Sequence, residues 1–125
     1  AFANAKGADL FLSIHQNSDG AEDGNGTVEG IETWYNSQKD KTSIELAKMV
    51  QKEVIAATGA KNLKIKEDNY YVVIKDTTMP ACLVECGFLT HKEERQRLVD
   101  DAYQQKIAEG IAKGVAEFTK KYLAK

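Results

Sequence analysis

Two ionisable side chains interrupt apolar segments of the sequence that are typical of buried strands. His15 ends the run ADLFLSIH, and Glu85 stands inside the run ACLVECGF. In open α/β sheets ligands bind beyond the carboxyl ends of the strands, so both side chains would face one crevice if their strands ran parallel. A histidine and a carboxylate in one crevice can bind a metal or transfer protons. The alternative is that both residues cap the sheet through hydrogen bonds, and composition alone favours that simpler interpretation.

Four segments show the composition of strands that would carry these residues. Residues 9–15 are apolar on both faces, which is typical of a strand that is covered on both sides. The segment GIETWYN alternates Ile31, Thr33 and Tyr35 with Glu32 and Trp34, as a strand with two different faces would. The complete set of expected strands is 9–15, 30–36, 70–75 and 81–88.

Two longer segments have the periodicity of amphipathic helices that would pack on such a sheet. Apolar residues recur every three or four positions over 42–57 and again from 103 to 122. The pairs Thr42/Glu45 and Thr90/Glu93 match capping boxes and predict where these helical regions begin. The polar stretches are interpreted as loops, at 18–29 and 60–69. The order of elements predicts an α/β domain with helices packed on the faces of one sheet.

The bulk properties of the chain limit its size class and its partners. The 125 residues are within the usual range of one domain. With 17 basic and 19 acidic residues the net charge is −2, which argues against a nucleic acid partner. We see no apolar run of the ~20 residues that a transmembrane helix needs, and no signal peptide pattern. Cys82 and Cys86 stand four apart in an expected strand, roughly 13 Å from Cα to Cα, which is too far for a disulfide.

At this point several segments resemble one known family. The segment ANAKGADLFLSIHQNS is similar to a signature of the zinc-dependent N-acetylmuramoyl-L-alanine amidases of the family 3 type. MPACLVECGFLTHKEE resembles their other signature, GIETWYN resembles an intervening strand, and YQQKIAEGIAKGVAEFTKKYL resembles their closing helix. The resemblance covers essentially the whole chain, in order, and the two signatures are its specific parts.

The resemblance implies a fold, a reaction and a set of roles. The fold would be a three-layer α/β/α arrangement of the phosphorylase/hydrolase-like type, with a mixed, mostly parallel sheet. The reaction would be cleavage of the amide between N-acetylmuramic acid and L-alanine in peptidoglycan, outside the cell or in the cell wall. His15 matches a zinc ligand, and Glu85 matches the acid/base beside the metal-bound water. Asn17 matches an asparagine that would orient the site through hydrogen bonds, although a loop residue that caps its own backbone is an equal alternative.

The chain departs from the family in its metal ligands. The family's Gly-His strand end and helix-borne glutamate have no match, and the two histidines present are His15 and His91. His91 as a substitute ligand is less favoured than a solvent-facing residue at a helix start. Because one histidine cannot hold a catalytic zinc, we expect residues 1–125 to be the carboxyl-terminal two-thirds of an amidase catalytic domain that lacks about a third at its N-terminus.

Two alternatives and one consequence follow from that departure. The chain could be a catalytically silent fragment that acts only as a folding or cell-wall-binding piece. It could also belong to a different metallohydrolase on a similar sheet, although two specific segments match one family. A missing inner strand would leave an open sheet edge with unpaired backbone groups, so we expect the isolated chain to self-associate, to swap elements, or to owe its order to chain outside these residues.

Overall fold

The structure, a computed structural model, describes residues 2–36, 41–68 and 75–123. Its elements, in chain order, are α1 (Phe2–Ala5), β1 (Phe11–Asn17), β2 (Ile31–Tyr35), α2 (Lys41–Thr58), β3 (Asn62–Glu67), β4 (Ala81–Phe88), α4 (Lys92–Leu98), α5 (Asp101–Phe118) and the π-helix η1 (Thr119–Leu123). Among these described helices, none combines the length and the apolar character needed to cross a bilayer.

The four described strands form one mixed sheet in the order β1-β4-β2-β3. Strand β1 runs parallel to β4, and β2 runs parallel to β3, whereas β2 and β4 are antiparallel. The central strand β4 is buried along its whole length, which explains why its sequence is almost continuously apolar. The expected α/β fold with a mixed, mostly parallel sheet is therefore confirmed.

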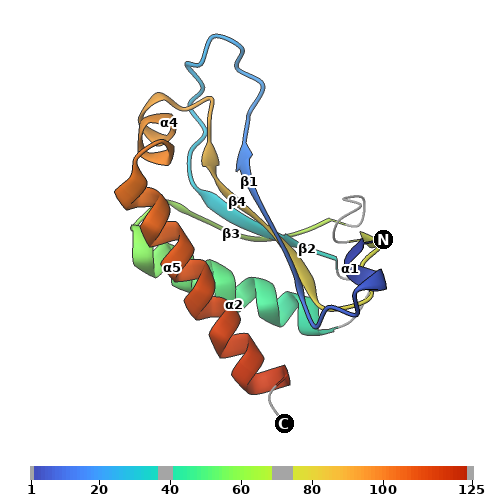
Figure 1. Cartoon of the computed structure of the whole chain (residues 1–125). Helices are drawn as coiled ribbons and strands as arrows, with labels where there is room; N and C mark the ends of the chain where they lie inside the picture. Colours follow the sequence, from blue (N-terminus) through green and yellow to red (C-terminus); the bar gives the residue numbers. More distant parts are fainter. Residues whose placement is uncertain (1, 37–40, 69–74, 124–125) are drawn as a thin grey trace.

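The two long helices α2 and α5 pack together on one face of the sheet (Figure 1). Their apolar stripes and the inward residues of β2 and β4 make one core, which includes Ile31, Leu46, Val50, Val54, Cys82, Val84, Ile107, Ile111 and Phe118. On the other side of β1, Figure 1 shows the short helix α1. Asn4 of α1 is tied to the segment before β4, because its side chain accepts from the backbone N–H of Thr78 at 2.8 Å.

Two glycines set how closely α5 approaches α2. A Cβ added at Gly110 would lie 2.7 Å from the Cα of Val54, and one at Gly114 would lie 2.6 Å from the Cα of Val50. Since real Cβ atoms do not come this close to backbone, only glycine permits this crossing. The backbones of the two helices therefore meet directly at these positions.

Three sequence-based expectations need correction. The polar segment 60–69, expected to be a loop, contains the strand β3, because pairing with β2 at the end of the sheet outweighs the low strand propensity of its lysine and asparagine residues. The expected caps are wrong at both capping boxes: α4 is capped by His91 rather than Thr90, and α2 begins at Lys41, so Thr42 lies inside the helix instead of at its N-cap. The capped segment then breaks at residues 99–100 before α5 begins, with Asp100 as the next N-cap. The strand expected at 70–75 lies, apart from the helical Lys75, outside the described residues.

Candidate active site

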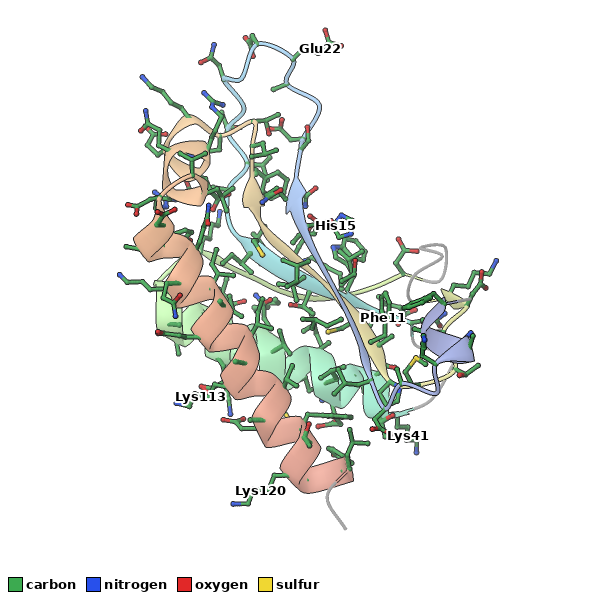
Figure 2. The ribbon with its side chains drawn as sticks, in the orientation of Figure 1. Phe11, His15, Glu22, Lys41, Lys113 and Lys120 are labelled. Atoms are coloured by element: carbon green, nitrogen blue, oxygen red, sulfur yellow. The ribbon has the colours of Figure 1, made fainter. Side chains whose placement is uncertain are left out.

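His15 and Glu85 are direct neighbours on the sheet. They are register partners in the parallel pairing of β1 with β4, so their side chains leave the same face. Cys82, Val84 and Cys86 belong to the core beneath α2 and α5, and strand alternation places Glu85 on the opposite face. Figure 2 shows the side chain of His15 on the side of β1 away from α5. The pair therefore lies together near the carboxyl ends of two parallel strands, as expected.

Glu85 is a buried carboxylate with an incomplete set of partners. Its side chain is 7% exposed, and its Oε2 atom is buried with no hydrogen bond partner in the described part of the chain. Burial raises the pKa of Glu85 above the usual value of 4.5, the nearby His15 partly opposes this rise, and the carboxylate of Glu32 adds to it. A carboxyl group with a raised pKa can both accept and return a proton near neutral pH.

Glu32 is a second buried carboxylate beside Glu85, and its sequence context gave little sign of this role. It is 7% exposed and is the register partner of Glu85 across the antiparallel pair β2/β4. The alternation in GIETWYN placed Glu32 on the polar face of a strand. The available signal was its position on the same face as Trp34, because a face that carries a large aromatic ring is seldom fully solvated.

Asn17 connects the end of β1 to this second carboxylate. Its Nδ2 donates to Oε1 of Glu32 at 2.9 Å, while its Oδ1 accepts from the backbone N–H of Ser18, also at 2.9 Å. Both roles weighed for Asn17 are thus compatible with its contacts. The amide satisfies an oxygen of Glu32 and also caps the start of the loop.

The ring of His15 is exposed and has one close polar partner. Its Nε2 lies 2.8 Å from the hydroxyl oxygen of Ser13, which precedes it by two residues on the same face of β1. A bond to one ring nitrogen fixes the ring's orientation and leaves the other nitrogen available to a ligand. His15 is therefore placed to bind a metal or a substrate group in front of the sheet.

His91 lies in a different environment from the one expected. Its side chain is only 15% exposed, and its Nε2 lies 2.7 Å from the carboxylate of Glu29. Its Nδ1 accepts from the backbone N–H of Glu94 at 3.2 Å, which is the N-cap bond of α4. The prediction of a solvent-facing residue was wrong, because the loop before β2 folds over the helix start. Through these two contacts the ring of His91 connects the loop before β2 to the start of α4.

The described residues do not contain a complete zinc site. No group of three or more histidine, cysteine, aspartate or glutamate side chains within 2–36, 41–68 and 75–123 could hold a metal ion. The accessible ring of His15 and the unpartnered oxygen of Glu85 fit a ligand and an adjacent proton-transfer group. Because a catalytic zinc needs three protein ligands, the others would have to come from outside these residues.

The cysteines take no part in this site. Cys82 and Cys86 are both free thiols, buried on the core side of β4, away from Glu85. Burial raises the pKa of each thiol to about 12, so neither forms a thiolate near neutral pH. The expectation that they form no disulfide with each other is confirmed.

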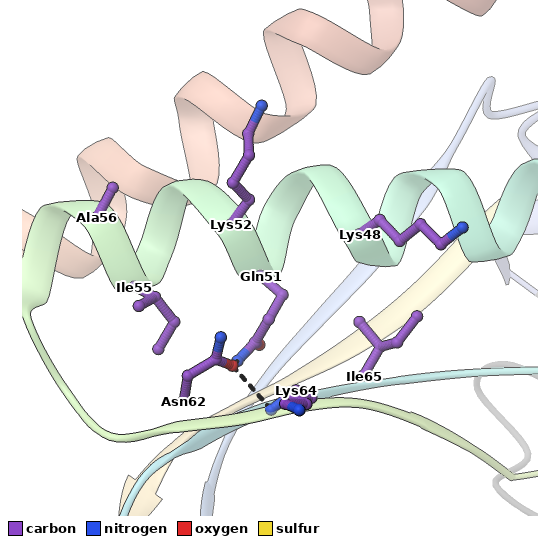
Figure 3. A pocket seen from close by; sticks show the side chains of 8 residues that line it. All are labelled: Lys48, Gln51, Lys52, Ile55, Ala56, Asn62, Lys64 and Ile65. Atoms are coloured by element: carbon purple, nitrogen blue, oxygen red, sulfur yellow. Dashed lines mark hydrogen bonds between the residues drawn. The ribbon is translucent and has the colours of Figure 1, made fainter.

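A groove lies away from this site, between α2 and the strand β3 at the other edge of the described sheet (Figure 3). It has a volume of about 510 Å³ and is lined by Lys48, Gln51, Lys52, Ile55, Ala56, Asn62, Lys64 and Ile65. The side chain of Gln51 in this groove already has its hydrogen bonds. Its Nε2 donates to Oδ1 of Asn62 and to the backbone oxygen of Ile31, and its Oε1 accepts from the hydroxyl of Thr33. Without an acid or histidine in its lining, this groove is not the place for proton transfer.

The comparisons with known proteins point to one family. Residues 1–117 match the family model described as N-acetylmuramoyl-L-alanine amidase. An amidase of that name from Clostridium difficile 630 has a crystal structure that superimposes with a TM-score of 0.89 at 38% identity, covering 97% of this chain. The catalytic domain of the amidase CwlV from Paenibacillus polymyxa gives a TM-score of 0.84 at 35% identity over 95% of this chain.

The same comparisons show that this chain spans only part of its relatives. It covers 63% and 62% of the two solved chains. It is 33% identical over 111 residues to the N-acetylmuramoyl-L-alanine amidase LytC of Bacillus subtilis, covering 89% of this chain and 22% of LytC. Among the curated relatives that it matches first, the covered share runs from 22% to 55% of their length.

Proposed function

Because the chain belongs to the N-acetylmuramoyl-L-alanine amidase family, we propose that its parent protein hydrolyses the amide between N-acetylmuramic acid and L-alanine in peptidoglycan. The observation that carries this proposal is the pairing of His15 with Glu85 inside a family match over residues 1–117. Water would add to the amide carbonyl, and the C–N bond would break to give a carboxylate and the free amino group of alanine.

Glu85 is the proposed acid/base of this reaction. Its unpartnered Oε2 would take a proton from the attacking water and then deliver it to the leaving nitrogen. The raised pKa of Glu85 supports this role, since a more basic carboxylate takes the proton from water more readily and keeps it until the leaving nitrogen accepts it. The neighbouring Glu32, held by Asn17, contributes to that rise.

His15 is the proposed zinc ligand of this chain. A bound zinc ion would polarise the amide carbonyl and lower the pKa of a water molecule. Ser13 bonds one ring nitrogen of His15 and thereby leaves the other for the proposed metal. Asn17 would act without touching the metal, by keeping Glu32 and the end of β1 in place.

Residues 1–125 are proposed to be the carboxyl-terminal two-thirds of a single catalytic domain. The 62% and 63% coverage of the solved amidases supports this division. Strand β1 lies at an edge of the described sheet, and Ile14 on it is 57% exposed. An open edge with an exposed isoleucine invites pairing, so we propose that this chain self-associates when it is produced alone. The cell wall amidases among its relatives support an extracellular or cell-wall location for the parent.

The function is tested with the full-length parent protein on purified peptidoglycan. Release of free alanine amino groups should require zinc, stop after treatment with a chelator and return when zinc is added. Glu85→Gln should retain zinc and lose turnover by about 10²–10⁴-fold, the usual contribution of a positioned acid/base. The matched control is Glu109→Gln on the exposed side of α5, which should keep wild-type turnover. Equal activity of Glu85→Gln and wild type would overturn the assigned role.

A further inference from the structure

Glu94 is a completely buried carboxylate that the proposed chemistry does not use. It lies in the first turn of α4 and is 1% exposed. Its nearest ion-pair partner among the described residues is Arg97, at 3.8 Å from Oε2. Acidic residues in the first turn of a helix normally lie in solvent, so the burial of this one requires specific partners.

Those partners are the backbone N–H groups of two strands. The N–H of Phe88 donates to Oε1 at 2.6 Å. The N–H of Gly30 donates to the same carboxylate, at 3.1 Å from Oε1 and 3.0 Å from Oε2. One side chain on α4 therefore joins the end of β4 to the residue that precedes β2.

These two strand ends are next to the carboxylates of the candidate site. Phe88 follows Glu85 by three residues on β4, and Gly30 precedes Glu32 by two residues at the start of β2. Glu85 and Glu32 are themselves register partners across the same antiparallel pair. The bonds to Glu94 thus hold together the ends of the strands from which both carboxylates project.

The backbone is shaped around this side chain. Gly87 has φ of +147°, and a Cβ there would lie 2.8 Å from Cγ of Glu94 and 2.9 Å from its Cδ. Only glycine leaves room for the carboxylate under the end of β4. The close fit means that the position of Glu94 is determined on one side by Gly87 and on the other by the N–H of Gly30.

We propose that Glu94 is a positioning residue for Glu85: its carboxylate locks the end of β4 against the start of β2 and so fixes the proton-transfer group in the sheet. This inference rests on the proposed function. Oε1 of Glu94 accepts from the N–H of Phe88 and shares the N–H of Gly30 with Oε2, whereas a glutamine that keeps its oxygen on Phe88 places an NH₂ donor against the N–H of Gly30. The isosteric Glu94→Gln substitution therefore weakens the link to the start of β2 while it preserves the volume of the side chain.

The test measures kcat and KM separately in the full-length parent, with Glu94→Gln, Glu94→Asp and a control that loses stability away from the site. Val54→Ala serves as that control, because Val54 is a fully buried core residue of α2. All variants are assayed well below their unfolding temperatures. Glu94→Gln should lower kcat by about 10- to 100-fold with KM changed less than about twofold, as expected when a reacting group is displaced. Glu94→Asp should fall between Glu94→Gln and wild type, and Val54→Ala should keep wild-type kcat.

The outcomes separate the inference from the function on which it rests. If Glu94→Gln retains the kcat of Val54→Ala at equal stability, Glu94 is merely structural and the inference is overturned. Should Glu94→Gln not fold, Glu94→Asp is compared with Val54→Ala by the same two criteria. Wild-type turnover in Glu85→Gln would instead remove the proposed acid/base, whatever the Glu94 variants show.

Discussion

The burial of Glu85 predicts that its removal stabilises the fold. The perturbation is Glu85→Gln in the metal-free, chelator-treated parent protein. Glu85 is 7% exposed, and its Oε2 has no hydrogen bond partner in the described part of the chain, so the ionised side chain loses its hydration without full replacement. The amide of glutamine carries no charge and is less costly to bury.

The pH dependence follows from the direction of the pKa shift. Burial raises the pKa of Glu85 above the usual 4.5, so the folded state binds this proton more tightly than the unfolded state does. Between 4.5 and the higher folded pKa, the wild-type protein therefore loses stability as pH rises. Glu85→Gln lacks this loss, so the two proteins should converge at low pH. A buried unsatisfied polar group costs about 1–3 kcal/mol, and because the amide also needs partners we expect a gain of about 1 kcal/mol at pH 8.

Urea unfolding at pH 4, 6 and 8 measures the free energy of unfolding for wild type, Glu85→Gln and the exposed control Glu109→Gln. The gain in Glu85→Gln should be near zero at pH 4 and largest at pH 8, whereas the control should change little at any pH. A Glu85→Gln protein that is less stable than wild type at pH 8, or a difference that does not depend on pH, would refute the argument from burial.

Three further predictions concern the surroundings of the site and the core. Gly114→Ala would place a Cβ 2.6 Å from a backbone Cα of α2, so urea unfolding should show a loss of about 1–3 kcal/mol despite the better helix propensity of alanine. Asn17→Asp replaces the amide that donates to Glu32 by a second carboxylate. The free energy of unfolding of Asn17→Asp, relative to that of Asn17→Ala, should therefore fall as pH rises above about 4, where aspartate ionises and repels Glu32. Equal pH profiles for the two variants would contradict this. Burial raises the pKa of Cys82 and Cys86 to about 12. A thiol reagent at pH 8 should therefore label both cysteines in urea and neither in the native protein. Fast labelling of the native protein would show that this face of the sheet is open.

The repeating pattern of apolar residues predicted the elements that form the core. The strand expected at 81–88 coincides with β4, and the stripe over 42–57 lies within α2, Lys41–Thr58. These patterns are strong because each element buries a whole face, and burial is what the periodicity records. Strand β3 was missed for the same reason. Strand β3 lies at an edge of the described sheet and most of its residues are exposed, so it buries little apolar surface and its sequence shows only a short apolar pattern.

The candidate site could be predicted only where a residue interrupts an apolar run. His15 and Glu85 stand out because each interrupts an apolar run in the sequence. The strand of Glu85 is buried as expected, whereas β1 lies at the edge of the described sheet with His15 exposed, so the expectation that it is covered on both sides was wrong. Glu94 stands among polar neighbours and Glu32 stands in an alternating strand, and the burial of both depends on segments far away in the sequence. The pairing of Glu94 with Gly30, which is 64 residues away, follows from tertiary structure and leaves no local pattern.

The direction of β2 explains why the usual rule for ligand sites in α/β sheets does not predict Glu32. Ligands collect at the carboxyl ends of parallel strands, and this rule finds His15 on β1 and Glu85 on β4. Strand β2 runs the other way, so Glu32 reaches the same edge from near the start of its strand. The site is therefore a row across three strands, His15, Glu85 and Glu32, in which Asn17 satisfies the outer carboxylate. With Glu32 paired in this way, Glu85 keeps the buried carboxylate oxygen that has no partner in the described part of the chain, and that oxygen is the one to which we assign the proposed proton transfer.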